Sequence, residues 1–140
     1  MIGAAVQHYR RRAAGFLGAA NDLDILDREG HAPAIGLLSV HGSIALADAV
    51  LVAVAGDRSR ADDHADSARK LRAWCSAKGI AEGGLKHFEW LLGKKSHFSY
   101  DADPVSESDC WQAKTKMHQF FAWALRAFPQ LSSLTEPDHA

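Results

Sequence analysis

Cysteine is scarce in this chain of 140 residues, which contains only Cys75 and Cys110. Two cysteines make neither a disulfide framework nor a four-ligand metal site. We therefore expect both to be small buried residues in a reducing compartment, and we expect no metal and no cofactor. The eight histidines are scattered, and none forms an i,i+4 pair with a carboxylate in a metal-binding arrangement.

The chain also lacks a membrane-spanning run. The apolar stretch from Ile44 to Ala55 is too short to cross a bilayer, and it contains Asp48. The N-terminal sequence MIGAAVQHYRRR does not fit a secretory signal, because its basic run follows only a short, mixed apolar stretch. These two absences predict a cytoplasmic protein without a membrane partner.

An excess of positive charge is missing as well, since the formal net charge is −1. Any nucleic-acid binding would therefore depend on a local patch. The run Arg10-Arg11-Arg12 is one such patch, and it fits either a solvated helix edge or a phosphate-facing surface. The P-loop, GxGxxG, HExxH, CxxC and GxSxG motifs are all absent.

What the chain does contain is helical periodicity, with much Ala and Leu and few β-branched residues. The pattern predicts an all-α, up-and-down bundle of four to five helices in a single domain, residues 1–128, followed by a frayed tail, residues 129–140. Gly30 is a plausible C-cap, and Ser59 and Ser106 are plausible N-caps. The predicted helices cover about 4–26, 32–55, 60–77, 81–95 and 106–128.

The stretch from Ile35 to Gly56 is the most apolar, and we expect it to be the central helix, buried nearly all round. A buried Asp48 then needs a partner from elsewhere, because an unpaired buried charge is costly. His41 lies on roughly the same helix face, and other candidate partners are Arg58, His64, Lys94 and Lys95. Such a pair would serve either as a structural lock or as a general acid–base pair.

A second concentration of polar residues lies between Lys94 and Asp101, where Lys95, His97 and Tyr100 also occur. Lysines supply charge, and His and Tyr can donate protons or stack on bases, so this segment could bind a phosphodiester. The same residues would equally suit an exposed helix end with Tyr100 packed back on the bundle.

The order of these segments resembles the HEPN superfamily of small helical bundles. The resemblance rests on SVHGSIALADAVLVAVAG, DRSRADDHADSARKL, LLGKKSHFSY and DADPVSESDCWQAKTKMHQFFAWAL, and it covers residues 5–128. Family motif positions correspond here to the following residues: Asp48, Gly56, Arg58, Ser59, Asp63, His64, Lys95 and Tyr100.

The resemblance implies work on RNA or nucleotides. Many members are metal-independent ribonucleases that use an Arg-x(4–6)-His motif from both subunits of a dimer, often as toxins paired with nucleotidyltransferase antitoxins. This chain has Lys95 near the Arg position and Tyr100 near the His position, and His97 is only two residues from Lys95. A Lys/Tyr pair can hold phosphate but is a poorer general base than His.

We therefore expect a homodimeric module that binds RNA or a nucleotide without strong catalysis. The expected binding residues are Arg58, Lys94, Lys95, His97 and Tyr100. A metal-independent ribonuclease would draw its catalytic groups from Asp48, His64, Lys95 and Tyr100, with His64 or His97 as the base. A protein-interaction bundle with a purely structural polar cluster is the third hypothesis.

Overall fold

The structure is a computed structural model, and it describes residues 3–56, 64–100 and 104–134. Within these ranges the chain forms helices and no strand, which confirms the predicted all-α bundle. The elements are α1 (Ala4–Asp27), α2 (Ala32–Ala55), α3 (His64–Lys78), α4 (Leu85–Tyr100), α5 (Glu107–Ala127) and a short 3₁₀ helix, η1 (Pro129–Leu134).

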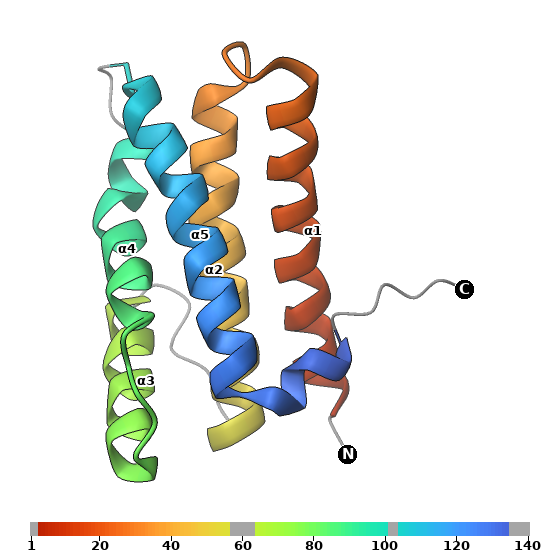
Figure 1. Cartoon of the computed structure of the whole chain (residues 1–140), viewed down its shortest axis with the longest axis vertical. Coiled ribbons are helices and arrows are strands. Elements are labelled where there is room, and N and C mark those ends of the chain that lie inside the picture. The colour runs from red at the N-terminus through yellow and green to blue at the C-terminus, as the bar shows by residue number, and fades with distance from the viewer. Residues whose placement is uncertain (1–2, 57–63, 101–103, 135–140) are drawn as a thin grey trace.

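Helix α2 is the centre of the bundle, as predicted. It contacts α1, α3, α4 and α5, and its contact with α1 is the most extensive in the molecule. Figure 1 shows α1 and α2 side by side, with α5 crossing in front of α2 and with α3 and α4 along the other edge. Gly56 ends α2 in the left-handed conformation at φ 71°, and its N–H donates to the Val52 carbonyl.

The length and composition of α2 are also those of a membrane span. Among the described residues it is the one helix with such a composition, but 67% of its most apolar 18-residue window is buried inside the bundle. Burial of this kind is what a core helix of a soluble protein shows.

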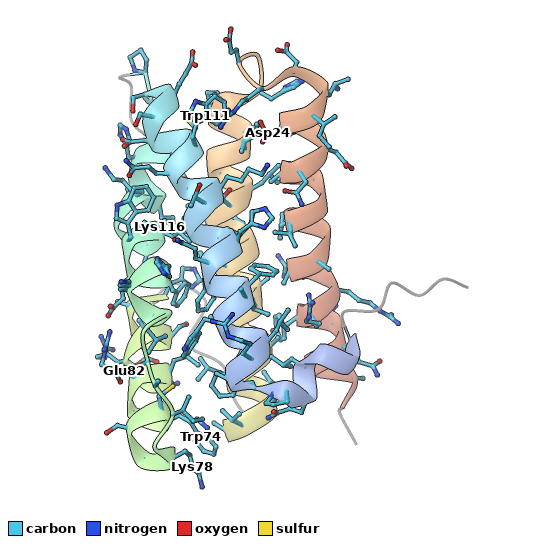
Figure 2. The ribbon with its side chains drawn as sticks, in the orientation of Figure 1. Asp24, Trp74, Lys78, Glu82, Trp111 and Lys116 are labelled. Carbon is cyan, nitrogen blue, oxygen red and sulfur yellow. The ribbon has the colours of Figure 1, made fainter. Side chains whose placement is uncertain are left out.

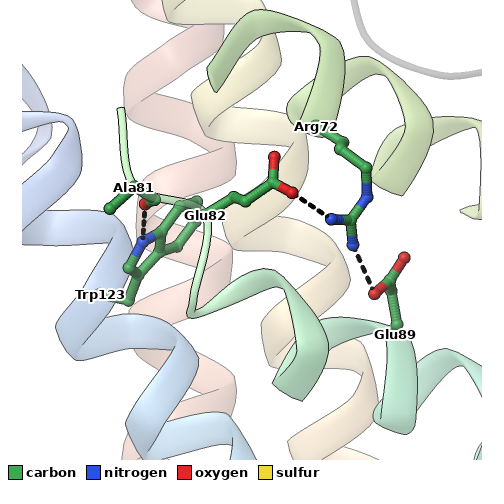
Figure 3. A network of polar contacts seen from close by, with 5 residues as sticks. All are labelled: Arg72, Ala81, Glu82, Glu89 and Trp123. Atoms are coloured by element: carbon green, nitrogen blue, oxygen red, sulfur yellow. Dashed lines mark hydrogen bonds and ion pairs between the residues drawn. The ribbon is translucent and has the colours of Figure 1, made fainter. Parts of the chain in front are cut away.

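An aromatic layer joins α4 to α5. The rings of Phe88 and Phe120 stack with centroids 4.9 Å apart, and Trp123 lies against Phe120. The Trp123 Nε1–H donates to the Ala81 carbonyl at 2.8 Å, as Figure 3 shows. A Cβ on Gly84 would lie 2.1 Å from the Trp123 ring, so only glycine fits beneath this side chain. The aromatic face of α5 is therefore core from Met117 onward.

A charged bridge fixes the turn between α3 and α4. Arg72 donates from Nη1 to Glu82 at 2.6 Å and from Nη2 to Glu89 at 2.7 Å (Figure 3). All three side chains are partly exposed to solvent. The pKa of Arg72 is raised, mainly by its hydrogen bond to Glu89, so every charge in this bridge has a partner.

Both predicted ends of α4 are wrong, and so is the predicted C-cap of α1, although α1 ends within one residue of the prediction. Helix α4 begins at Leu85 and continues to Tyr100, whereas residues 81–95 were expected. Gly93 lies in its interior with open space around it, and Phe98, only 9% exposed, extends the core face beyond it. Helix α1 ends at Asp27, and Gly30 is not its C-cap. The Gly30 N–H instead donates to the Asp27 carboxylate at 3.1 Å.

The C-terminal end of the bundle is more ordered than predicted up to residue 134. Leu131 is fully buried and Phe128 is 2% exposed, so the start of the expected frayed tail is packed on the core. Ser106 is the N-cap of α5, as predicted, because its Oγ accepts the Asp109 backbone N–H at 3.1 Å. The Ser59 cap and residues 135–140 lie outside the described residues.

Candidate functional site

Three of the predicted site residues come from three different helices. Asp48 lies in the middle of α2 and is 5% exposed. His64 is the first residue of α3 and Lys95 lies in the last part of α4, both half-buried. Asp48 and His64 each take part in a polar or electrostatic contact within the chain.

His41 lies where these helices and α1 come together. It precedes Asp48 by seven residues, which is two helical turns, so both side chains project from the same side of α2. Its ring lies 6.0 Å from the ring of Phe16 of α1, measured between centroids. The guanidinium carbon of Arg12 lies 6.0 Å from the centroid of the same Phe16 ring, so α1 adds an arginine to this region.

The residues that act electrostatically on His41 are indicated by the causes of its pKa shift. The pKa of His41 is lowered, first by burial and then by repulsion from Lys95, His64 and Arg12. The basic groups that repel a protonated His41 therefore come from three other helices: Arg12 from α1, His64 from α3 and Lys95 from α4. We call Arg12, His41, His64 and Lys95 the His41 cluster. All the neighbours that shift its central imidazole are basic.

This arrangement has a clear chemical consequence. Gathering like charges beside a half-buried imidazole is unfavourable, and the imidazole responds by losing its proton more easily. A bound anion would reverse that balance by attracting Arg12 and Lys95 and by favouring protonated His41. Asp48 projects from the same side of α2, two helical turns after His41, and is 5% exposed.

The residues of the predicted segment from Lys94 to Tyr100 lie on different sides of helix α4. Consecutive helical residues are separated by about 100° around the axis, so Lys94 and Lys95 point to different sides of α4. Lys94 lies over the Trp90 ring at 5.6 Å from Nζ to centroid, and its Nζ is 3.5 Å from an Asp109 carboxylate oxygen. Lys94 therefore belongs to the surface between α4 and α5, away from the His41 cluster.

The other predicted site residues are less closely defined. The His97 ring lies 6.0 Å from the neighbouring Phe98 ring, and His97 has a further contact within the chain. The backbone of Tyr100 ends α4, but its side chain lies outside what the structure describes. Arg58 and Asp63 also lie outside the described residues.

Neither cysteine is suited to chemistry or to metal binding. Both side chains are fully buried and neither forms a disulfide. Burial raises the pKa of Cys75, and it raises the pKa of Cys110 to about 11, so both remain thiols at neutral pH. Within residues 3–56, 64–100 and 104–134, no group of three or more His, Cys, Asp or Glu side chains could hold a metal ion.

We did not predict from the sequence that one of the three consecutive arginines on α1 is buried while the other two are exposed. Arg11 and Arg12 are exposed, but Arg10 is only 3% exposed, so the solvated-edge interpretation is wrong for Arg10. Val6, Arg10, Ala13 and Ala20 form the buried face of α1, and this spacing could have revealed Arg10. Arg12 belongs to the His41 cluster because Arg12 and His41 both lie 6.0 Å from the ring of Phe16, which follows Arg12 by four residues on α1.

No family model matches the chain, and no curated protein or solved structure is significantly similar to it. The function must therefore be argued from the residues themselves.

Proposed function

We propose that the chain is a HEPN-like helical bundle that binds the phosphate groups of RNA or a nucleotide at the His41 cluster. The observation that carries the proposal is that Arg12 and His41 both lie 6.0 Å from the Phe16 ring, in a region where Lys95 and His64 also act on His41. Basic groups that repel one another in the empty protein are stabilised together by a phosphate. Arg and Lys supply permanent charge, and an imidazole N–H adds a directional donor.

We also propose a homodimer as the working form, as the resemblance to HEPN proteins implies. A mass measurement in solution, such as light scattering coupled to size-exclusion chromatography, would give about twice the mass of one chain.

A second candidate function follows from the lowered pKa of His41. An imidazole that stays neutral at neutral pH can act as a general base, so His41 rather than His64 or His97 would take a proton from an RNA 2′-hydroxyl. The 2′-oxygen would then bond to the adjacent phosphorus and the bond to the 5′-oxygen would break, with a proton delivered to that leaving oxygen. Lys95 would stabilise the charge that develops on the phosphate.

RNA binding at low and high salt tests the main proposal. We expect a fluorescently labelled single-stranded RNA to bind the full chain with salt-dependent affinity. Lys95→Ala should lower the affinity and reduce the slope of log affinity against log salt by about one. Lys78→Ala is the matched control, because Lys78 is the exposed last residue of α3 and lies over Trp74 instead of the His41 cluster.

Two results decide the matter. Equal binding by the wild-type chain and Lys95→Ala, or no binding of any RNA or nucleotide at low salt, would overturn the proposal. For the ribonuclease alternative, the same RNA is incubated with the chain in EDTA. Cleavage that disappears in His41→Gln supports it, and intact RNA rejects it while leaving the binding function in place. An antitoxin of the nucleotidyltransferase type in the same cytoplasm would be the partner expected of such an enzyme.

A further inference from the structure

A groove runs along the surface between α4 and α5, on a different side of α4 from Lys95. Its upper part has a volume of about 670 Å³ and is lined by Trp90 of α4 and by Trp111, Gln112, Lys116 and Gln119 of α5. Figure 2 shows Trp111 near the start of α5 and Lys116 farther along it, at the boundary with α4.

The groove continues toward the N-terminal end of α4. A second hollow of about 440 Å³ shares Gln119 with the first and is lined by Gly84, Lys86, His87 and Arg126. The pKa of His87 is lowered by burial, by Lys116 and by Lys86, so Lys116 links the two hollows electrostatically. Among the described residues, His87 Nδ1 is buried and has no hydrogen-bond partner.

The charges along this groove have one sign. Its two hollows are lined by Lys86, Lys116 and Arg126, and no Asp or Glu lines either of them. The neighbouring carboxylates are each paired. Glu89 pairs with Arg72 at 2.7 Å, and Asp109 lies 3.5 Å from Lys94. Asp24, which lines an adjoining hollow that also includes Trp111, pairs with Lys114 and Arg28. The groove is therefore complementary to an anion.

Its other end is aromatic. Trp123 is buried and gives its N–H to Ala81, whereas Trp90 and Trp111 are half-buried and face the groove. Arg28 lies over the Trp111 ring, 4.0 Å from its centre, and Lys94 lies over the Trp90 ring at 5.6 Å, so each indole already has a cation over one face. Tryptophan faces bordered by cations are the surfaces on which unpaired bases stack.

We propose that the groove between α4 and α5 binds a phosphorylated nucleobase, with the base on Trp90 and the phosphate among Lys86, Lys116 and Arg126. His87 lies one helical turn before Trp90 on α4 and lines the same hollow as Lys86 and Arg126. The ligand is either a free nucleotide or one unit of a single-stranded RNA. This proposal rests on the proposed function for the class of ligand, a phosphorylated nucleobase. The residues that would bind the ligand are different from those of the His41 cluster.

Tryptophan fluorescence of the full chain provides the test, with a mononucleotide in one arm and an RNA octamer in the other. We expect quenching in at least one arm, and the arm that responds identifies the source of the ligand. Trp90→Ala should weaken binding about tenfold, since stacking on one aromatic ring is worth about that much. Trp90→Phe keeps a ring and should restore most of the affinity, and Trp74→Phe is the control because Trp74 lies in a hollow between α2 and α3.

Substitutions of charged residues distinguish a loss of binding from a loss of folding. Lys86 and Arg126 are exposed, so Lys86→Gln with Arg126→Gln should leave the melting temperature unchanged while it weakens binding. Binding that weakens in Lys95→Ala but not in the groove variants would overturn the inference and leave the proposed function standing. Equal binding of inorganic polyphosphate without quenching would also overturn it, because charge alone would then explain the affinity.

Discussion

Arg72 and His41 differ in how their surroundings treat a positive charge. Arg72 lies between Glu82 and Glu89, and its pKa is raised (Figure 3). The pKa of His41 is lowered, first by burial and then by repulsion from Lys95, His64 and Arg12. A charge matched by carboxylates stabilises the fold it belongs to, so Arg72 needs no ligand to explain it. Like charges brought together oppose folding, and their presence is explained when a ligand completes the site.

Among the substitutions, Asp48→Ala should cause the largest loss in the free energy of unfolding. Asp48→Ala removes a buried carboxylate from the same side of α2 as His41, and breaking a buried charge interaction costs about 3–5 kcal/mol. Chemical denaturation should show a loss in the free energy of unfolding of this size. Asp66, paired with Arg69 and Lys70 on the outside of α3, is the matched control, and Asp66→Ala should leave the midpoint nearly unchanged. Equal effects would remove the distinction between the two sites.

Arg10 extends the comparison to a buried cation. It is 3% exposed, its pKa is lowered by burial, and among the described residues its Nε and Nη1 have no hydrogen-bond partner. Arg10→Met keeps an unbranched side chain without the polar atoms, and it should raise the free energy of unfolding by about 1–2 kcal/mol. Arg11→Met, at an exposed position, should change little. A loss of stability in Arg10→Met would instead mean that Arg10 is matched by an anion.

The pH dependence of stability sharpens the comparison further. The folded-state pKa of His41 lies below its ordinary value of about 6.5, so the unfolded chain binds the proton more readily. Stability is then fully present above pH 6.5 and is lost as the pH falls through 6.5 toward the folded-state value. His87 and His118, also lowered mainly by burial, act in the same direction. Thermal melts between pH 8 and pH 5 should show this loss, and His41→Gln should reduce it. An unchanged slope in His41→Gln would contradict the assignment.

The smallest loss of stability should come from breaking the ion pairs of Arg72 with Glu82 and Glu89. Arg72→Met breaks two ion pairs whose side chains are about two-fifths exposed, and such pairs contribute about 0–1 kcal/mol. A denaturation midpoint close to that of the wild-type chain is the expected result. A loss as large as that of Asp48→Ala would show that the turn between α3 and α4 depends on Arg72 much more than its exposure suggests.

Much of the fold could be predicted because hydrophobic spacing and caps act locally. The bounds of α2 match the prediction, and Ser106 caps α5 as its sequence indicates. The predicted C-terminal end of α4 was wrong because the burial of Phe98 against other helices decides where α4 continues, and Gly93 lies in its interior. Tertiary packing overrides a propensity cost of about 1 kcal/mol for one glycine.

The candidate site could be predicted only in part. Asp48 was found because a charge within an apolar helix is conspicuous in any sequence. Arg12 could not be placed in the His41 cluster, since that depends on how α1 packs against α2. Lys94 and Lys95 are adjacent in sequence but belong to different surfaces, and Trp111 lines a groove that no sequence pattern indicates. Each of these outcomes depends on the direction of a side chain relative to a neighbouring helix.

The pKa of His41, measured by NMR with and without a saturating single-stranded RNA, tests the central claim most directly. We predict a value below the ordinary histidine value in the free protein and a rise when RNA binds, because a phosphate favours the protonated ring. A His41 pKa that is not lowered in the free protein, or that stays the same while RNA binds, would contradict the account.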